Sequence, residues 1–472
     1  MRAADVDVRV LDKAVGPAVT SRALGLQPRG VEVLDLLGAL GDLPDRGLPI
    51  RNVTINVDGR ELASFPVGQP TRLGGPRGLL TSQADIEGAL RDRLTALGGS
   101  VEWGRGVNGL APGPAGVTVR LDEGSEVDAT WVVGSDGAHS VVRKAMGVGF
   151  PGVPIVERFL LADVHADIDL QRGGATTWLR AGMALAAFPL PGDDVWRVMA
   201  PAPTELGDEP PPEAIADYLG TRLAAEARER SNPRVDFVVP DTPPAGRHVA
   251  GGRVLLAGDA AHIHSPLGGQ GMNTGIGDAE NLAWKLALVV SGRADQRLLD
   301  TYEAERRPIA KGVLETTSSV TEVAVGQGRG SRLLRDRIAV PLINQRWLQN
   351  LITERASQLR VSYRNGPLGA GLSRFLPGLR AGDRVADRTS ERFDGTSIRL
   401  YDELGPAWAL LGPEPLADAA RERLGHVVAL RGERDALLAR PDGHLAWRGA
   451  DAVGLQAWLD SALGPRVGVL TP

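Results

Sequence analysis

The chain has 472 residues, of which 43% are hydrophobic and 24% charged, a composition typical of a protein that folds into two or three domains. Its net charge of −5 and its lack of Lys/Arg-rich runs argue against nucleic-acid binding and against a polybasic membrane anchor. It has no cysteine, which excludes disulfides, thiolate catalysis and cysteine-ligated metals, and its seven histidines show no metal-binding spacing.

The front of the chain alternates strand-like and helix-like segments. Residues 6–11 predict an apolar strand that ends on Asp12, and a proline opens a predicted helix over 28–40. Two alternating runs that meet at an Asp-Gly pair, residues 58–59, predict a hairpin. A capping-box pattern and an apolar stripe predict a further helix over 82–97.

The middle and the end of the chain have different patterns. Long alternating runs over 159–239, interrupted by a predicted helix at 212–228, predict an antiparallel sheet inserted into the first unit. A buried strand at 254–257 returns to the parallel type, and a helical stretch follows to about residue 358. After a break rich in Gly and Pro, residues 383–472 predict a small C-terminal α/β unit.

A glycine pattern of the phosphate-binding type occurs at Gly104, Gly106 and Gly109. Such a pattern holds a pyrophosphate only where a helix begins at its last glycines, because the helix N-terminus supplies the N–H groups. Pro112 and Pro114 follow here and forbid a helix. We therefore predict a turn between two short strands at this place.

The strongest motif lies in residues 253–287. A predicted strand delivers Gly258 and Asp259 to its carboxyl end, where open α/β sheets hold their ligands. A turn over 268–271 (Gly-Gly-Gln-Gly) then leads into a predicted helix, whose first turn presents free backbone N–H groups to a developing anion. A weaker motif of the same kind ends a strand at Asp136, with Ser140 and Arg143 at the start of a short helix.

In this order and at these intervals, the motifs resemble those of the single-component FAD-dependent aromatic hydroxylases, in particular the aromatic polyketide hydroxylases and the rifampicin- and tetracycline-type monooxygenases. The segments that carry the resemblance are Asp12, "SRALGL" (21–26), "SQADIEGAL" (82–90), "SDGAHSVVR" (135–143), "LLAGDAAHIHSPLGGQGMNTGIGDAENLAWKL" (255–286) and "ARPDGHLAWRG" (439–449).

The resemblance implies an α/β fold: a Rossmann-like, glutathione-reductase-type FAD-binding domain, an inserted antiparallel-sheet substrate domain and a C-terminal thioredoxin-like domain. The implied boundaries are 1–158 and 251–365 for the two parts of the FAD domain, 159–250 for the substrate domain and 383–472 for the C-terminal domain.

The resemblance also implies a set of cofactor-binding residues. Asp12 would bind the adenosine ribose, Arg22 and Gln83 would approach the pyrophosphate and ribityl region, and Val107 would contact the adenine side through its backbone. Asp259 would hold a ribityl hydroxyl, Pro266 would line the flavin side of the substrate pocket, and Gly269, Gly271, Met272 and Asn273 would face the pyrimidine end of the flavin. Asp136 and Arg143 are associated in the family with FAD and NADPH.

The activity implied by the resemblance is hydroxylation of an aromatic or polyketide-like small molecule by dioxygen, with FAD as cofactor, NADPH or NADH as electron donor, and a flavin C4a-hydroperoxide as intermediate. No catalytic side chain is assigned, His262 and His264 included. Two alternatives are a non-catalytic ligand-binding relative and an FAD-linked reductase or dehydrogenase without oxygen transfer.

Other expectations concern the substrate side and the start of the chain. The substrate is expected under the inserted sheet, near Trp178, Met183, Phe188 and Trp196, which by alternation could equally be core residues. Only eleven residues precede Asp12, so the glycine fingerprint of the family is missing and weak FAD affinity and poor stability are expected. The protein is expected to be cytoplasmic, a monomer or a homodimer, and bound to neither membrane nor nucleic acid.

Overall fold

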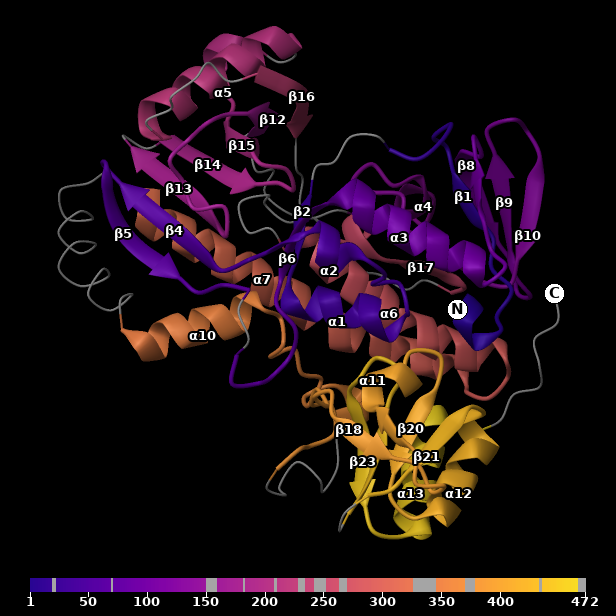
Figure 1. Cartoon of the computed structure of the whole chain (residues 1–472). Coiled ribbons are helices and arrows are strands. Elements are labelled where there is room, and N and C mark those ends of the chain that lie inside the picture. The colour runs from indigo at the N-terminus through magenta and orange to yellow at the C-terminus, as the bar shows by residue number, and fades with distance from the viewer. Residues whose placement is uncertain are drawn as a thin grey trace.

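The computed structural model describes the chain except for residues 19–22, 69–70, 150–158, 181–182, 208–209, 228–233, 242–251, 263–269, 326–344, 370–377, 433–434 and 466–472. Figure 1 shows a central unit of short strands and long helices, a large, mostly antiparallel sheet on one side of it and a C-terminal unit on the opposite side; one pair of the large sheet, β13 (Gly174–Arg180) and β4 (Asn52–Val57), is parallel.

The central unit contains two pairs of parallel strands. β1 (Val10–Asp12) pairs with β7 (Val101–Trp103), and β11 (Val132–Gly134) pairs with β17 (Val254–Leu256). All three residues of β17 are apolar and no more than 1% exposed, as expected for a parallel strand covered on both faces. β1 is shorter than the strand predicted over residues 6–11, because its pairing with β7 begins only at Val10.

Beside these pairs lies a three-stranded antiparallel sheet. It contains β8 (Val107–Pro112), β9 (Val117–Leu121) and β10 (Glu126–Ala129) in the order β10-β9-β8. The residues that follow Gly109 therefore continue a strand. This confirms that the glycine pattern at 104–109 does not open a helix.

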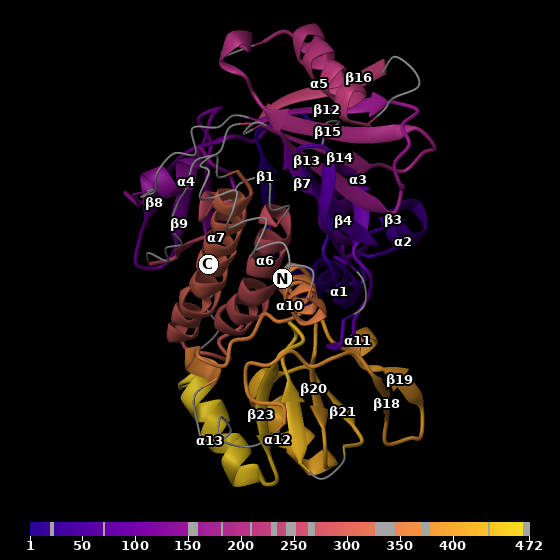
Figure 2. The same cartoon turned by 90° about the vertical axis from the view of Figure 1, so that its left-hand side faces the viewer.

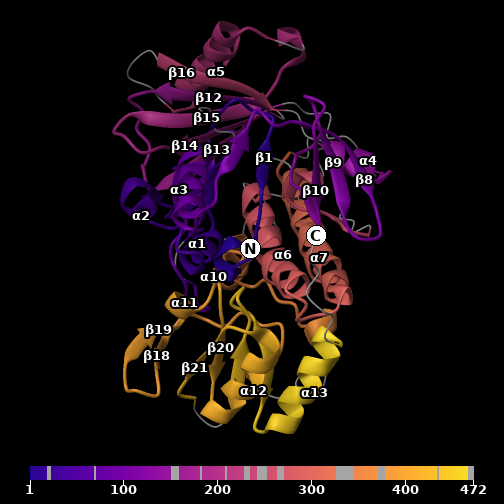
Figure 3. The same ribbon diagram turned by 90° about the vertical axis from the view of Figure 1, so that its right-hand side faces the viewer.

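Four helices dominate the central unit: α1 (Pro28–Leu36), α3 (Gln83–Ala96), α6 (Gly271–Val290) and α7 (Asp300–Val325). α3 begins as predicted, with the Ser82 hydroxyl accepting the backbone N–H of Asp85 at 3.1 Å. α6 and α7 lie side by side (Figures 2 and 3). The smaller elements are α2 (Leu43–Arg46), α4 (Val141–Ala145), α10 (Arg346–Ala356), and the sheet of β2 (Leu24–Leu26), β6 (Leu79–Ser82) and β3 (Leu48–Pro49).

The large sheet has seven strands in the order β16-β12-β15-β14-β13-β4-β5. Their bounds are β4 (Asn52–Val57), β5 (Arg60–Phe65), β12 (Phe159–His165), β13 (Gly174–Arg180), β14 (Met183–Pro189), β15 (Val195–Pro201) and β16 (Arg234–Asp241). The hairpin predicted at residues 58–59 is confirmed, and both turn residues have the positive φ of a type I′ turn (+49° and +80°). Because β4 pairs with β13, this hairpin extends the sheet beyond the predicted range 159–250.

The two faces of this sheet have different partners. α5 (Pro212–Ala227) covers one face and buries alternate residues of the strands, such as Leu160, Val164 and Val198. The other face carries the intervening residues Phe159, Leu161, Ala186 and Met199, with Phe188 packed against them. Figure 2 shows α5 on the outer side of the sheet, so the second face is turned toward the central unit.

The C-terminal unit is a four-stranded mixed sheet with helices. Its sheet order is β21-β20-β22-β23, in which β20 and β21 are parallel and the other neighbours antiparallel. Its elements are β18 (Thr389–Glu391), β19 (Ser397–Arg399), α11 (Leu400–Glu403), β20 (Trp408–Leu411), α12 (Glu414–Leu424), β21 (Val427–Leu430), β22 (Ala436–Ala439), β23 (Leu445–Gly449) and α13 (Ala452–Leu463).

The C-terminal unit shares a hydrophobic core with α6. Leu282 and Leu286 of α6 belong to the same buried cluster as Leu410 and Leu455 of the C-terminal unit. Trp284 and Trp408 meet edge to face across this junction, with their ring centroids 5.2 Å apart. The unit is therefore packed onto the central helices (Figure 3).

Candidate functional site

Carboxylates follow two of the parallel strands. Asp12 ends β1 and Asp259 follows β17, and both side chains are exposed. The Asp12 carboxylate accepts the backbone N–H of Ala14 at 2.9 Å, and its carbonyl accepts the N–H of Arg105 at 2.8 Å. This second bond holds the segment that leads into Val107 beside the end of β1.

The carboxylate of Asp278 fixes the turn that follows β17. Gly258 has a φ of +58°, which favours glycine, and its backbone N–H donates to the Asp278 carboxylate at 3.1 Å. The same carboxylate bonds the His262 ring at 2.6 Å and accepts from the Arg306 guanidinium at 2.7 Å. His262 is 2% exposed and so occupies a structural position, in line with its receiving no catalytic role.

The start of α6 faces the same region. The side chain of its N-cap residue, Gln270, makes no capping hydrogen bond among the described residues, so the N–H groups of the first turn and the positive end of the helix dipole are available to a ligand. The Asn273 amide ties the helix to the segment before α1, since it accepts the N–H of Gln27 at 2.9 Å and donates to the carbonyl of Gly25 at 3.2 Å. Gly30 allows this approach, because a Cβ there would lie 2.4 Å from the Asn273 side-chain oxygen.

Glycines also bring α6 close to the turn after β17. A Cβ added to Gly275 would lie 3.4 Å from the Cα of Gly258, so the helix backbone and the turn are nearly in contact. Met272 packs against the cluster that contains Leu26 and Val31. Its side chain therefore helps to fix the helix start.

The motif around Asp136 braces the turn after β17. The Asp136 carboxylate accepts the N–H groups of Val141 and Val142 and so caps α4. Arg143 is 4% exposed, and its guanidinium donates to the carbonyls of Ala138 (2.7 Å) and Ala260 (3.0 Å). Burial lowers the pKa of Arg143, but an arginine remains charged at neutral pH.

Gln83, at the first position of α3, reaches the segment after β1. Its side-chain oxygen accepts the backbone N–H of Ala23 at 3.1 Å. Arg197, on the sheet face opposite α5, was not predicted from the sequence. Its guanidinium donates to the carbonyl of Ala23 at 3.3 Å. Arg197 is 2% exposed and forms a bidentate pair with Asp163 (2.7 and 2.8 Å). An arginine among apolar residues in "VWRVMA" was the signal that could have revealed it.

Direct contacts connect several of the candidates: Arg143 bonds the carbonyl of Ala260 next to Asp259, and Gln83 and Asn273 bond residues 23–27. Three of the expected residues, Arg22, Pro266 and Gly269, lie outside the described residues. Gly271, Met272 and Asn273 lie in the first turn of α6, as predicted.

The expected aromatic lining of the substrate side needs a correction. Trp178 and Trp196 are 6% and 2% exposed and belong to the core between the sheet and α5. Alternation along β13 and β15 turns them away from the central unit, so the expectation that they lie near the substrate is wrong. Phe188 lies on the opposite face, and the side chain of Met183 is outside the described residues.

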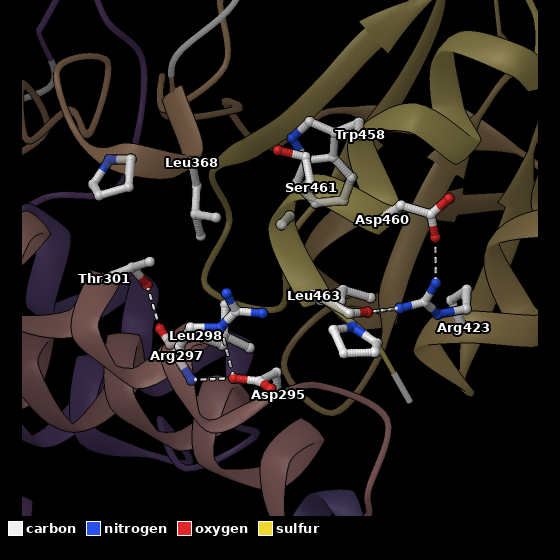
Figure 4. A pocket seen from close by; sticks show the side chains of 14 residues that line it. Asp295, Arg297, Leu298, Thr301, Leu368, Arg423, Trp458, Asp460, Ser461 and Leu463 are labelled. Atoms are coloured by element: carbon white, nitrogen blue, oxygen red, sulfur yellow. Dashed lines mark hydrogen bonds and ion pairs between the residues drawn. The ribbon is translucent and has the colours of Figure 1, made fainter. Parts of the chain in front are cut away.

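A cavity of about 630 Å³ lies elsewhere, between the turn at Gln296–Leu299 and α13 (Figure 4). Arg297 and Arg423 line it, but each is paired with an aspartate, Asp295 and Asp460, so the charges cancel. This cavity lies at the far end of α6, roughly 30 Å of helix from Gly271. We therefore do not assign it to the candidate site.

The described residues contain no group of three or more His, Asp or Glu side chains that could hold a metal ion. In the same part of the chain, none of the helices is both long and apolar enough to cross a membrane.

Comparisons with known proteins agree with this arrangement. Residues 1–317 match the protein family described as an FAD binding domain. The chain is 34% identical to a rifampicin monooxygenase of Streptomyces venezuelae over 98% of this chain and 95% of that protein. It is 30% identical to a dialkyldecalin synthase of Streptomyces rugosporus over 98% and 95% of the two chains. The solved structure of an anhydrotetracycline hydroxylase from Streptomyces rimosus superimposes with a TM-score of 0.78 at 32% identity, covering 99% of this chain and 96% of that one.

Proposed function

The chain belongs to the FAD-binding family of flavin-dependent aromatic hydroxylases, and from this premise we propose that it is a monooxygenase of aromatic or polyketide-type small molecules. It uses FAD as its cofactor and NADPH as electron donor. The observation that carries the proposal is the uncapped start of α6 beside the Gly258–Asp259 turn, in a chain that is similar over nearly its whole length to a rifampicin monooxygenase.

The residues at the strand ends fit FAD. Asp12 and Asp259 are exposed acceptors of the kind that bind ribose and ribityl hydroxyls, and they lie at the edge where α/β sheets hold nucleotides. The close approach of Gly258 and Gly275 packs the turn directly against the first turns of α6, which fixes the two segments that would border the cofactor. FAD, when bound, supplies the oxidation of NADPH and the activation of dioxygen.

The protein contributes orientation and electrostatics to this chemistry. The first-turn N–H groups of α6, at Gly271 and Met272, favour negative charge on the ring system that they face. Asn273 fixes this helix start to residues 25–27, and Asp278 fixes the turn opposite to it. Gln83 and the backbone near Val107 complete the predicted cofactor contacts, and Asp136 and Arg143 hold the turn from the side of α4.

The substrate side is the sheet face opposite α5. On this face Phe159, Leu161 and Met199 are buried and Phe188 is partly exposed, so we propose that Phe188 makes the apolar contact with a polycyclic aromatic ligand. The Arg197–Asp163 pair adds a charged group next to the segment that follows β1.

Several finer points are part of the same proposal. The seven-stranded sheet is the inserted substrate domain, and the β-α-β and β-β-α order of the C-terminal unit is that of a thioredoxin-like domain. With no cysteine, that domain does no thiol–disulfide exchange. A cytoplasmic location agrees with the use of NADPH. The domain boundaries and a monomeric or homodimeric state stay predictions.

The proposal is tested by incubating the FAD-loaded protein with NADPH, isotope-labelled dioxygen and a panel of polycyclic phenols. We expect NADPH oxidation to rise with one substrate and a product that contains one labelled oxygen atom. NADPH oxidation without label in any product would indicate the reductase alternative. Because one relative is named a dialkyldecalin synthase, a product of unchanged mass and new ring structure would also contradict the proposal.

A further inference from the structure

Ionisable groups are buried where α6 and α7 meet the C-terminal unit. Burying a charge is costly unless partners compensate it, so such a network is retained only where its geometry is satisfied. The side chains of this network are at most 8% exposed and are those of Arg29, Asp278, Glu280, Lys285, Glu305, Arg306, Arg440 and Asp442.

The C-terminal unit enters the network through Arg440 and Asp442. The Arg440 guanidinium donates to Glu305 of α7 at 2.9 Å and to Asp442 at 2.9 Å. Asp442 accepts the indole N–H of Trp284 of α6 at 3.0 Å. Lys285 of α6 donates to the remaining oxygen of Glu305 at 2.8 Å. Both long helices are thus bonded to the C-terminal unit by charged groups that water cannot reach.

Tyr363 connects this cluster to the next one. Its side chain is buried, and its hydroxyl accepts from the Arg306 guanidinium at 3.0 Å. Its ring lies 5.0 Å from the Arg440 guanidinium and its centroid is 4.5 Å from that of His444. Two residues of the C-terminal unit therefore fix the orientation of the Tyr363 ring, and with it the position of the hydroxyl.

Arg306 carries the connection to the turn after β17. Its guanidinium makes three bonds: to the Tyr363 hydroxyl, to the Asp278 carboxylate at 2.7 Å and to the carbonyl of Thr274 in the first turns of α6 at 3.0 Å. Asp278 in turn bonds the N–H of Gly258 and the His262 ring. Each of these three partners of Arg306 is buried, so water cannot replace a hydrogen bond that one of them loses.

We propose that Tyr363 and Arg440 are positioning residues for the cofactor turn: through Arg306 and Asp278, the C-terminal unit sets the geometry of residues 258–262 and of the start of α6. This rests on the proposed function only in taking that turn as the FAD site. The C-terminal unit then has a role in flavin binding through this chain of hydrogen bonds. A purely structural role would instead stabilise the junction and leave the turn unchanged.

The test uses Tyr363→Phe, which keeps the ring and its stacking but removes the acceptor for Arg306. Tyr401→Phe is the matched control, because Tyr401 is equally buried and its hydroxyl donates at 2.8 Å to the carbonyl of Val385 within the C-terminal unit. Gly277→Ala is a second test variant, since its Cβ would lie 2.9 Å from the Arg306 guanidinium and displace it without deleting a polar group.

Two measurements are made on each full-length variant: hydrogen exchange of residues 254–262 without FAD, and the dissociation constant for FAD. For Tyr363→Phe and Gly277→Ala we expect exchange in 254–262 to become about tenfold faster and the FAD dissociation constant to rise about five- to tenfold, with strand β20 unchanged. Tyr401→Phe is expected to alter neither.

Equal behaviour of Tyr363→Phe and Tyr401→Phe, or faster exchange spread evenly over the junction, would overturn the positioning role. The two proposals fail separately. Wild-type protein that binds no FAD would refute the proposed function, whereas the exchange measurement on the FAD-free protein would still decide whether Tyr363 controls the turn.

Discussion

At the scale of single residues, the exposed carboxylates and the buried ones have different tasks. Asp259 and Asp12 are exposed at strand ends, where a ligand hydroxyl can reach them. Asp278 is fully buried and bonded by a backbone N–H, a histidine and an arginine, so it holds the turn and cannot touch a ligand. The sequence motif predicted the first kind, because Gly-Asp after a strand is a local pattern. It did not predict the bonds of Asp278, whose arginine partner is 28 residues further along the chain.

Replacing Asp259 by Ala is expected to raise the dissociation constant for FAD about tenfold, because a change of this size corresponds roughly to the free energy of one hydrogen bond to a charged group. The side chain is exposed, so the thermal unfolding temperature should stay close to that of the wild type. A fluorescence titration with FAD measures the change. Asp128→Ala serves as control, since this exposed aspartate on β10 accepts the hydroxyl of Thr118 on β9 at 2.7 Å. Equal FAD affinity in the two variants would contradict the assignment of Asp259.

At the scale of elements, local sequence patterns predicted the starts of α1 and α6, the Asp58-Gly59 hairpin and the alternation of β12 to β15. They could not decide which face of the sheet α5 covers, since a period of two is the same for either choice. For this reason Trp178 and Trp196 were expected near the substrate and are core residues in the structure.

Gly30→Ala tests the contact between α1 and α6. The new Cβ would lie 2.4 Å from the Asn273 side-chain oxygen, so the amide must move and its bonds to residues 25 and 27 must lengthen. We expect FAD affinity to fall at least fivefold and stability to fall by about 1 to 3 kcal/mol, the range for overpacking.

The control for this variant is Gly312→Ala in α7, where no atom lies within 4 Å of the new Cβ. An open helical position gains up to about 1 kcal/mol from alanine, so this variant should be unchanged or more stable in a denaturant titration. If Gly30→Ala behaves in the same way, the close approach of α1 to Asn273 is not required for the helix start.

At the scale of the whole molecule, the buried ion network makes stability depend on pH. Burial opposes the charge on Glu305, but Arg440 and Lys285 outweigh it and hold the pKa of Glu305 at about 2. Because the pKa of Glu305 is lower in the folded than in the unfolded protein, its ionised carboxylate stabilises the fold at pH values above the unfolded pKa. This stabilisation is lost as the pH falls toward 2. Burial lowers the pKa of the Lys285 ammonium to about 8, and this group does not titrate in the same range.

Glu305→Gln isolates this contribution, because the difference in unfolding free energy between wild type and variant contains the titration of Glu305. We expect the difference to shrink by about 1.4 kcal/mol between pH 6 and pH 3.5. Denaturant titrations at several pH values measure it. A difference that stays the same down to pH 3.5 would show that Glu305 is not held ionised by Arg440 and Lys285.

We propose that FAD binds between the ends of β1 and β17 and the start of α6. Hydrogen exchange measured while FAD is titrated into the protein tests it most directly. We predict that FAD protects residues 258–260 and 271–276, and that protection saturates at one FAD per chain. No saturable protection of these residues, or protection confined to the cavity beside α13, would contradict the account.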